Sequence, residues 1–442
     1  MSQSVGQSLT KKLARGGASS LFVKIASAGL SFFMFIVIAR GMTADGFALF
    51  GFGFSAATLM VLGGSMGQRV GALRFIPVHM ERGDIPGMRG FTRRGYLLVL
   101  GGCAILSLLF VLASEVSDRL TGGFYPWTVA FFTVSLGLAE YQSHVLRAHG
   151  SIVLALAPRE VIWRAAVVAL FAIPAIGLSG PIPVTWGFLV ISLMLLALTI
   201  VQAGLYAETR PQALLRSPVS YESRTEWDRS AWVFWSSSVL SAATPNVAML
   251  IVGVLLSAED SGAFFAALRL AMVVNLFMVA ANMLAMPMMS AAHERGDMDG
   301  IRDINRFVVL FTGIPGALFF LLFLLEGGWT LALFNKEFSF AHWALVLVAG
   351  GYLVRVLSGP APAMLQMMGQ ERRYMKMLLW AIGVLLASLV PLVWAFGIHG
   401  AAVAAGLEQV ATGVFGVWMC RRSLKIDPSV MCLVNKGRVA AG

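Results

Sequence analysis

A charge inside a long apolar stretch of sequence needs a physical reason, and five such residues are candidate site residues here. They are Lys24, Glu140, Arg269, Arg355 and Glu408. An ionisable group near the centre of a bilayer costs about 2.5–3.5 kcal/mol on insertion scales. Such a side chain therefore faces a polar cavity, pairs with an opposite charge or extends to the membrane surface. The cations suit an anionic ligand, and the carboxylates suit a proton or a cation.

Lys24 shares one face of a predicted helix with three hydroxyl side chains. At helical spacing, this face contains Ser20, Lys24, Ser27 and Ser31. The opposite face is apolar, which favours a lysine directed toward protein or water. The alternative is that Lys24, near one end of its stretch, extends to the membrane surface.

A second hydroxyl stripe lies in the stretch 232–256, with Ser237, Ser241 and Thr244 at similar spacing. Pro245 and Asn246 follow directly. A proline inside a helix frees backbone groups, so we predict a kink here that lines a cavity. Ser241 and Asn246 are therefore candidate ligand-binding residues.

The stretch 262–289 carries Arg269, Asn275 and Asn282. The two asparagines share one helix face, whereas Arg269 lies on another. We include all three, with Arg355, among the candidate binding residues. Extension to the membrane surface is the alternative for Arg269, and a structural ion pair is the alternative for Arg355.

Glu408 is the stronger candidate for binding a coupling proton or monovalent cation. Its helix face contains Ala401 and Ala404, and such small residues predict close helix packing. A carboxylate there is protonated or partnered, and an internal ion pair is the alternative role. Glu140 is the second candidate, but Arg147 follows two turns later, which favours a structural pair between them.

The composition identifies the kind of protein that must position these side chains. Of the 442 residues, 58% are hydrophobic and 12% charged, and the mean hydropathy is +0.80. Soluble domains are about half apolar and a quarter charged. These values exclude a soluble globular, disordered or disulfide-scaffold protein. The continuous apolar runs predict membrane helices rather than alternating barrel strands.

We predict an all-α polytopic membrane protein with twelve transmembrane helices. The predicted spans are residues 18–40, 46–68, 94–113, 124–146, 155–177, 184–206, 232–256, 262–289, 306–326, 340–360, 374–396 and 400–420. The predicted domains are a cytoplasmic segment 1–17, an N-lobe 18–206, a linker 207–231, a C-lobe 232–420 and a tail 421–442.

The basic residues indicate the orientation of this topology. Of the 33 Lys and Arg residues, only Arg40, Arg119 and Lys336 fall on the side opposite the termini, apart from the three cations inside spans. By the positive-inside rule, both termini are expected in the cytoplasm. The net charge of +11 is thus mainly a topology signal, and no nucleic-acid partner is expected.

A sequence repeat relates the two predicted lobes. The segment 80–84 resembles the segment 293–297, and at the same separation Arg89 corresponds to Arg302 and Arg93 to Arg306. Two parallel six-helix lobes are typical of a transporter. We find no nucleotide-binding, metal-ligand or nucleophile motif, so we expect neither an enzyme nor a resident cofactor or metal.

Several segments together resemble bacterial polysaccharide flippases of the Wzx type, in the multidrug/oligosaccharidyl-lipid/polysaccharide (MOP) exporter superfamily. They are Ala39-Arg40-Gly41 with Ala44-Asp45-Gly46-Phe47, Glu81-Arg82-Gly83-Asp84, Leu146-Arg147-Ala148-His149-Gly150, Leu365-Gln366-Met367-Met368-Gly369, and Phe396-Gly397-Ile398-His399-Gly400-Ala401-Ala402. The resemblance implies a two-lobed MATE-like fold with alternating access.

The resemblance also implies the cargo, an undecaprenyl-diphosphate-linked oligosaccharide moved to the periplasmic leaflet of the bacterial inner membrane. Related flippases hold the diphosphate with cavity cations, which implies this role for Lys24 and Arg269. Membrane lipids and proteins of polysaccharide polymerisation or assembly are the implied partners of a monomeric carrier. A coupling proton or monovalent cation is the only further ligand expected.

Two alternatives come from other functional classes. The first is a cation-coupled multidrug antiporter of the same superfamily, which the lysine on the first polar face disfavours. The second is another integral membrane protein of polysaccharide assembly, such as a glycosyltransferase or polymerase. The short predicted outer loops disfavour this second alternative.

Overall fold

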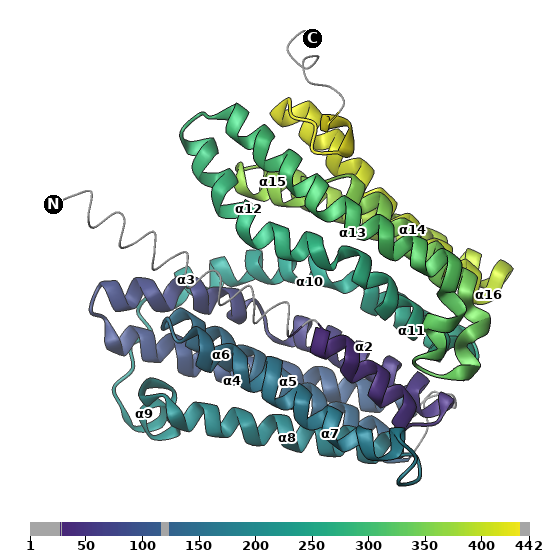
Figure 1. Ribbon diagram of the computed structural model, residues 1–442. Coiled ribbons are helices and arrows are strands. Elements are labelled where there is room, and N and C mark those ends of the chain that lie inside the picture. Colours follow the sequence, from purple (N-terminus) through teal and green to yellow (C-terminus); the bar gives the residue numbers. More distant parts are fainter. Residues whose placement is uncertain (1–26, 28, 116–122, 434–442) are drawn as a thin grey trace. The chain divides into compact units, whose positions relative to one another are not determined.

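The computed structural model describes residue 27, residues 29–115 and residues 123–433, which are predominantly helical (Figure 1). No strand occurs within these ranges. The described residues group into a first compact unit, residues 33–262, and a second compact unit, residues 263–433 together with 29–32. The predicted all-α fold is confirmed.

In the first unit, α5 packs against α2, α3, α4 and α8, and α10 packs against α2 and α3. In chain order the elements are the helix Gly29–Gly41, whose residues 29–32 belong to the second unit, α2 (Ala44–Gly64), α3 (Gln68–Glu81), α4 (Ile85–Glu115), α5 (Tyr125–Ala148), α6 (Ile152–Ala157), the π-helical segment η1 (Pro158–Trp163), α7 (Arg164–Ala175), α8 (Val184–Leu205), η2 (Ala207–Thr209), α9 (Pro211–Arg216) and α10 (Arg224–Leu255).

In the second unit, α14 packs against both α13 and the long helix α16. The elements are α11 (Ala258–Ala271), whose first turns belong to the first unit, η3 (Met272–Asn275), α12 (Leu276–Glu294), α13 (Met298–Ala332), η4 (Lys336–Ala341), α14 (His342–Leu357), α15 (Ala361–Met367), α16 (Glu371–Leu424) and η5 (Val430–Leu433).

Each of the twelve predicted spans falls mainly on helical residues, as far as the described ranges extend. Within those ranges, seven helices are long and apolar enough to cross a membrane, or eight with the bent helix α10. The long helix α16 contains two predicted spans, whereas the predicted span 155–177 is divided among α6, η1 and α7. The chain is thus a multi-pass membrane protein.

Gly397 divides α16 between the last two predicted spans. Its φ of +56° and ψ of −131° lie in a backbone region that residues other than glycine rarely adopt. Three residues later, a Cβ on Gly400 would lie 1.8 Å from the Leu392 carbonyl oxygen. The Phe-Gly-Ile-His-Gly motif therefore forms a tight reversal that requires both glycines.

The sequence repeat is also a structural repeat. After α3, Gly83 has φ +68° and the Asp84 amide donates to the His79 carbonyl at 2.9 Å. After α12, Gly296 has φ +70° and the Asp297 amide donates to the Ala292 carbonyl, also at 2.9 Å. These bonds are those of the Schellman motif, in which glycine at C′ ends a helix.

The aspartates of the repeat then begin the next helices. Asp84 accepts from the Gly87 amide at 2.9 Å, and Asp297 accepts from the Gly300 amide at 2.8 Å. An aspartate at this position satisfies an amide that the helix leaves unpaired. The Glu-Arg-Gly-Asp turns are thus explained by helix ending and capping.

The axis of α10 turns by 56° between Arg224–Leu240 and Pro245–Leu255, as Pro245 predicts. Along the chain, the boundary between the compact units falls between residues 262 and 263, whereas the predicted boundary between the lobes is the linker 207–231. The difference follows from α10, which packs on α2 and α3. The assignment of six spans to each lobe stays a prediction.

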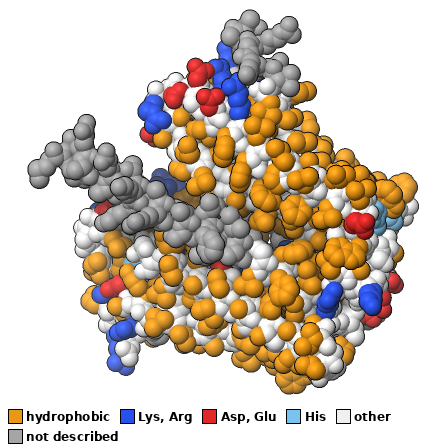
Figure 2. Space-filling view, viewed as in Figure 1, with side chains coloured by type: hydrophobic (Ala, Val, Ile, Leu, Met, Phe, Trp, Pro, Cys, Tyr) orange, Lys and Arg blue, Asp and Glu red, His pale blue; other side chains and the backbone are white. Residues whose placement is uncertain are grey.

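Apolar side chains cover much of the visible surface over α13 and α14 (Figure 2). On α13, Phe307, Ile314, Leu318 and Leu325 are each at least 60% exposed. Large apolar patches of this kind mark an interface with lipid or protein. On a helix of 35 residues, they are the surface expected to face acyl chains.

Candidate functional site

The structure places the predicted site residues in two groups. Arg269, Asn275, Asn282, Arg355 and Glu408 belong to the second unit, as do Ser27 and Ser31. Glu140, Ser241 and Asn246 belong to the first unit. Ser20 and Lys24 lie outside the described residues, and the Ser241 side chain is likewise outside the described part of the structure.

A chain of hydrogen bonds connects two of the second-unit residues. Arg355 on α14 donates from Nη1 to Gln409 Oε1 at 2.6 Å. Gln409 donates from Nε2 to Glu408 Oε2 at 2.6 Å, and the Thr412 hydroxyl donates to Glu408 Oε1 at 3.1 Å. We call Arg355, Gln409, Glu408 and Thr412 the Glu408 chain.

The Glu408 chain balances a buried carboxylate without a direct ion pair. Glu408 is 4% exposed and Thr412 is 1% exposed. The amide of Gln409 presents its oxygen to the cation and its nitrogen to the carboxylate, so both charges are satisfied. The direct internal pair considered for Glu408 is replaced by one that the Gln409 amide mediates.

Close helix packing surrounds Glu408, as its small neighbours predict. Ala401 and Ala404 are fully buried, and a Cβ on Gly351 of α14 would lie 2.5 Å from the Gly406 carbonyl oxygen. The two backbones therefore approach closely where α14 crosses α16. Such small-residue contacts are characteristic of membrane helices.

Arg269 lies half-buried near the end of α11. Its guanidinium carbon is 4.5 Å from the centroid of the Phe265 ring, a cation–π contact. The charged candidates of the second unit thus lie on three different helices, with Arg269 on α11, Arg355 on α14 and Glu408 on α16.

Asn275 and Asn282 each carry a buried, unsatisfied polar atom within the predicted span 262–289. Asn275 ends the 3-10 segment η3, which interrupts the predicted span 262–289. The Oδ1 atoms of both asparagines are buried and have no hydrogen-bond partner among the described residues. A buried acceptor without a donor is costly, so these positions suit a ligand or water that donates.

In the first unit, Glu140 lies in a cluster of charged residues that we call the Glu140 cluster. It contains Arg69, Glu140, Arg159, Glu160 and Arg164. Glu140 pairs with Arg69 and, at 2.8 Å, with Arg159 Nη1. Arg164 Nη2, on α7, lies 3.0 Å from Glu160 Oε2, on η1. The cluster joins α3, α5 and η1.

The prediction that Glu140 pairs with Arg147 was wrong, although Glu140 does form structural ion pairs. Arg147 is exposed, and the pairing falls instead to Arg69 and Arg159. The reason is that η1 brings Arg159 back onto α5.

Asn246 is buried on α10, and Ser27 is buried as well.

Gln409 and Glu160 were not among the predicted site residues. Gln409 follows Glu408 directly, and this polar pair inside an apolar span was an available signal. Glu160 lies between two arginines of η1 and α7, which resembles an ordinary surface sequence. Among the described residues, no group of three His, Cys, Asp or Glu side chains is placed to hold a metal ion.

Solved structures define the class of this fold. The chain matches an inward-facing multidrug resistance MATE family transporter of the MOP superfamily with a TM-score of 0.69, at 12% identity, over 94% of this chain and 100% of that one. A Vibrio cholerae MATE transporter matches with a TM-score of 0.57, at 14% identity, over 95% and 98% of the two chains.

A third structure is a MOP superfamily transporter from Pyrococcus furiosus, described as having a binding pocket of reverse polarity. It matches with a TM-score of 0.55, at 15% identity, over 91% of this chain and 95% of that one. The fold is therefore that of the MATE transporters, a MOP-superfamily fold. Comparison with curated proteins gives no sequence match.

The family is narrower than the fold. A family model described as "polysaccharide biosynthesis protein" matches residues 13–293, more than half of the chain. The chain belongs to this polysaccharide biosynthesis family. The expected membership of a polysaccharide family and the expected MATE-like fold are both confirmed.

Proposed function

We propose that this protein is a flippase that moves an undecaprenyl-diphosphate-linked oligosaccharide from the cytoplasmic to the periplasmic leaflet. The carrying observation is membership of the polysaccharide biosynthesis family in a chain with a transporter fold. The product serves O-antigen, capsule or exopolysaccharide assembly. The protein lies in the bacterial inner membrane with both termini in the cytoplasm, as its basic residues favour.

The polar residues of the second unit supply the chemistry that this cargo needs. A diphosphate entering an apolar region requires cationic partners, because an unpaired buried anion is expensive. Arg269 and Arg355 supply two cations from the second unit, and Lys24 supplies a third from the first predicted span. Movement of the lipid breaks no bond, so the protein is a carrier rather than an enzyme.

The sugars need hydrogen-bond partners rather than charges. The unpartnered Oδ1 atoms of Asn275 and Asn282 accept from sugar hydroxyls. The remaining candidate residues, on the first and seventh predicted spans, are further hydrogen-bond partners for the sugars: Ser20, Ser27, Ser31, Ser241 and Asn246. The polyprenyl tail stays in lipid throughout.

Glu408 couples transport to a proton or a monovalent cation. When Glu408 is ionised, its charge balances Arg355 through Gln409. Protonation removes that balance and leaves the Arg355 guanidinium to the diphosphate. Glu140, held by two arginines, has a structural role instead.

The test is transport by the purified protein in liposomes that contain the lipid-linked oligosaccharide. A membrane-impermeant glycosidase reports how much sugar reaches the outer leaflet. We expect Arg355→Gln and Lys24→Ala to slow transport by about tenfold or more, the loss of one charge-assisted bond to phosphate. Arg372→Gln is the matched control, because Arg372 is an exposed cation on α16.

Two further measurements address coupling and the alternative. A pH or sodium gradient should accelerate transport by the wild type and not by Glu408→Gln. Normal transport by Arg355→Gln and Lys24→Ala at matched protein levels would contradict the phosphate-binding role. The alternative, a cation-coupled multidrug antiporter, is favoured by the shared MATE fold. It predicts export of a cationic dye and no movement of lipid-linked sugar.

A further inference from the structure

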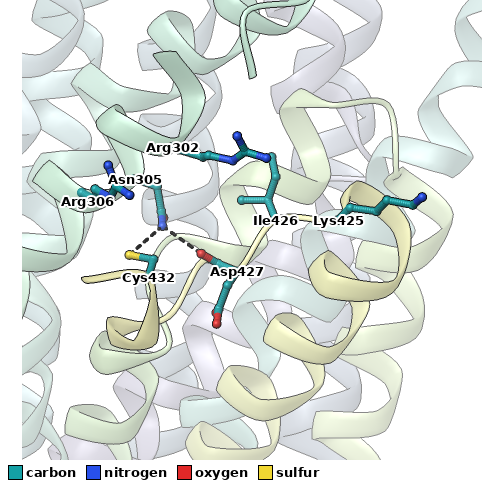
Figure 3. A pocket seen from close by; sticks show the side chains of 7 residues that line it. All are labelled: Arg302, Asn305, Arg306, Lys425, Ile426, Asp427 and Cys432. Carbon is teal, nitrogen blue, oxygen red and sulfur yellow. Dashed lines mark hydrogen bonds between the residues drawn. The ribbon is translucent and has the colours of Figure 1, made fainter. Parts of the chain in front are cut away.

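A pocket lies at the end of the second unit where α13 begins and the segment after α16 crosses it. We call it the α13 pocket. Its lining comprises Arg302, Asn305, Arg306, Lys425, Ile426, Asp427 and Cys432. Figure 3 shows Arg306 and Lys425 at opposite ends of this lining, with Asn305 and Asp427 between them. Three cations and one carboxylate therefore share a small space.

The carboxylate of the pocket is already engaged. Asp427 accepts from Arg421 Nη2 at 2.6 Å on one oxygen. It accepts from the Ser429 amide at 3.0 Å and the Ser429 hydroxyl at 2.7 Å on the other. The cationic partner of Asp427 is thus Arg421, not Arg302 or Arg306.

The exposed carboxylates on α13 balance these two arginines only weakly. Arg302 bonds Asp299 at 2.7 Å and Arg306 bonds Asp303 at 3.1 Å, each with one nitrogen. The aspartate side chains are 88% and 75% exposed. Exposed pairs of this kind contribute about 0–1 kcal/mol, so a ligand can compete for the guanidinium groups.

The repeat supplies an internal comparison for this site. Arg89 of α4 corresponds to Arg302 of α13. In the first unit, Arg89 donates to the part-buried Glu208 at 2.9 and 3.3 Å. In the second unit, Arg302 instead bonds the exposed Asp299 of its own helix with one nitrogen. The arginine that a carboxylate holds by two bonds in one repeat is therefore held by one exposed bond in the other.

A buried amide of the pocket also lacks a partner. Asn305 is 1% exposed, and its Nδ2 donates to the Asp427 carbonyl at 3.1 Å and to Cys432 Sγ at 3.4 Å. Its Oδ1 has no donor within the described part of the chain. A ligand that satisfies the whole pocket carries a negative group for the arginines and a hydroxyl or N–H group for Asn305.

The surroundings of the pocket indicate where such a ligand comes from. Directly after Arg306, α13 exposes Phe307, Phe311 and Ile314, with exposed fractions of 63%, 44% and 60%. Met431 of η5, which directly precedes the pocket residue Cys432 in the sequence, is 55% exposed. Charged lining thus gives way to an apolar helix surface, as at the level of lipid headgroups.

We propose that the α13 pocket binds the headgroup of an anionic glycerophospholipid, with its phosphate held by Arg302 and Arg306 and a headgroup hydroxyl donating to Asn305. The acyl chains lie along the apolar face of α13. This site is separate from the transport residues and does not rest on the proposed cargo. Its ligand is a resident membrane lipid that ties the start of α13 to the segment after α16.

The test measures thermal unfolding of the full chain in neutral detergent with added dioctanoyl-phosphatidylglycerol. Wild type should unfold at a higher temperature with this lipid and not with dioctanoyl-phosphatidylcholine. In the double variant Arg302→Gln with Arg306→Gln, the apparent affinity should fall by about tenfold or more. The matched control, Arg372→Gln with Arg373→Gln, removes two exposed cations outside the pocket and should keep the wild-type affinity.

Several outcomes would overturn the proposal. Equal stabilisation by inorganic phosphate identifies a free-anion site, and equal stabilisation by phosphatidylcholine removes the charge selectivity. Equal loss in the control variant means a diffuse surface charge. If the double glutamine variant does not fold, Arg302→Lys with Arg306→Lys keeps the charge but removes the fork of donors, and weaker binding is still expected. None of these outcomes depends on transport.

Discussion

At the scale of single residues, the second unit keeps a buried carboxylate close to a cation without letting the two touch. Gln409 lies between Arg355 and Glu408 and bonds both at 2.6 Å. In the Glu140 cluster, by contrast, arginines contact the carboxylates directly. A mediated pair is easier to open than a direct one, which suits Glu408 to a change of charge and Glu140 to a fixed role.

The first prediction concerns the Glu140 cluster. Glu140→Gln leaves Arg69 and Arg159 with less than a full countercharge, and their side chains are only 13% and 23% exposed. Breaking a buried pair in this way costs about 3 kcal/mol. Denaturant or thermal unfolding in detergent should therefore report a clearly less stable protein.

The control for this prediction is Asp299→Asn, which removes the exposed partner of Arg302. Its effect on stability should stay within about 0.5 kcal/mol. Equal effects of the two substitutions would show that the Glu140 cluster contributes no more than a surface pair.

At the scale of helices and turns, the repeated Glu-Arg-Gly-Asp segment predicts a loss of stability in both halves when its aspartate is removed. Asp84→Ala and Asp297→Ala each remove a side-chain oxygen that accepts a helix amide. Loss of such a cap costs about 0.5–2 kcal/mol. Each variant should unfold at a lower temperature, and the double variant should show the sum of the two losses. A loss in one half alone would contradict the structural repeat.

The cap at Asp84 also has a pH dependence of known sign. The Gly87 amide, with a further hydrogen bond from His79, lowers the pKa of Asp84 below its ordinary value of 3.8. A lowered carboxyl pKa stabilises the fold above the unfolded value and loses that contribution as pH falls through the folded value. Below this window, Asp84→Asn and wild type should therefore have more similar stabilities than at neutral pH.

The reversal inside α16 gives the fourth prediction. Gly397→Ala forces a side chain into a backbone region that glycine occupies, at a cost of about 1–3 kcal/mol. Gly383→Ala on the same helix is the matched control, because a Cβ there meets open space. The control should be neutral or slightly stabilising. Equal stability of both variants would mean that the break at Gly397 is not required.

At the scale of the whole molecule, the sequence predicted the features that depend on local patterns. Apolar runs predicted the helical spans, and glycine followed by aspartate marked the repeated turns, because these depend on the chemistry of neighbouring residues. The partners of Glu140 and the role of Gln409 depend on which helices meet. The π-helical turn at Pro158–Trp163 determines the partners of Glu140, and the crossing of α14 with α16 determines the role of Gln409. Neither feature produces a periodic pattern in the sequence.

The last prediction concerns the direction in which the two repeats cross the membrane. Six spans in each repeat place the turns at Arg82 and Arg295 on one side and the turn at Lys336 on the other. In a background with Cys432→Ser, where Cys103 and Cys420 are buried, single cysteines at these three exposed positions can be labelled selectively. A membrane-impermeant maleimide added to intact cells should label Lys336→Cys and leave Arg82→Cys and Arg295→Cys unmodified until the membrane is opened. Labelling of Arg82→Cys and Arg295→Cys from opposite sides would require an odd number of spans between them. The repeats would then be inverted, and the parallel two-lobed carrier would have to be abandoned, although the capping geometry that the two turns share would remain.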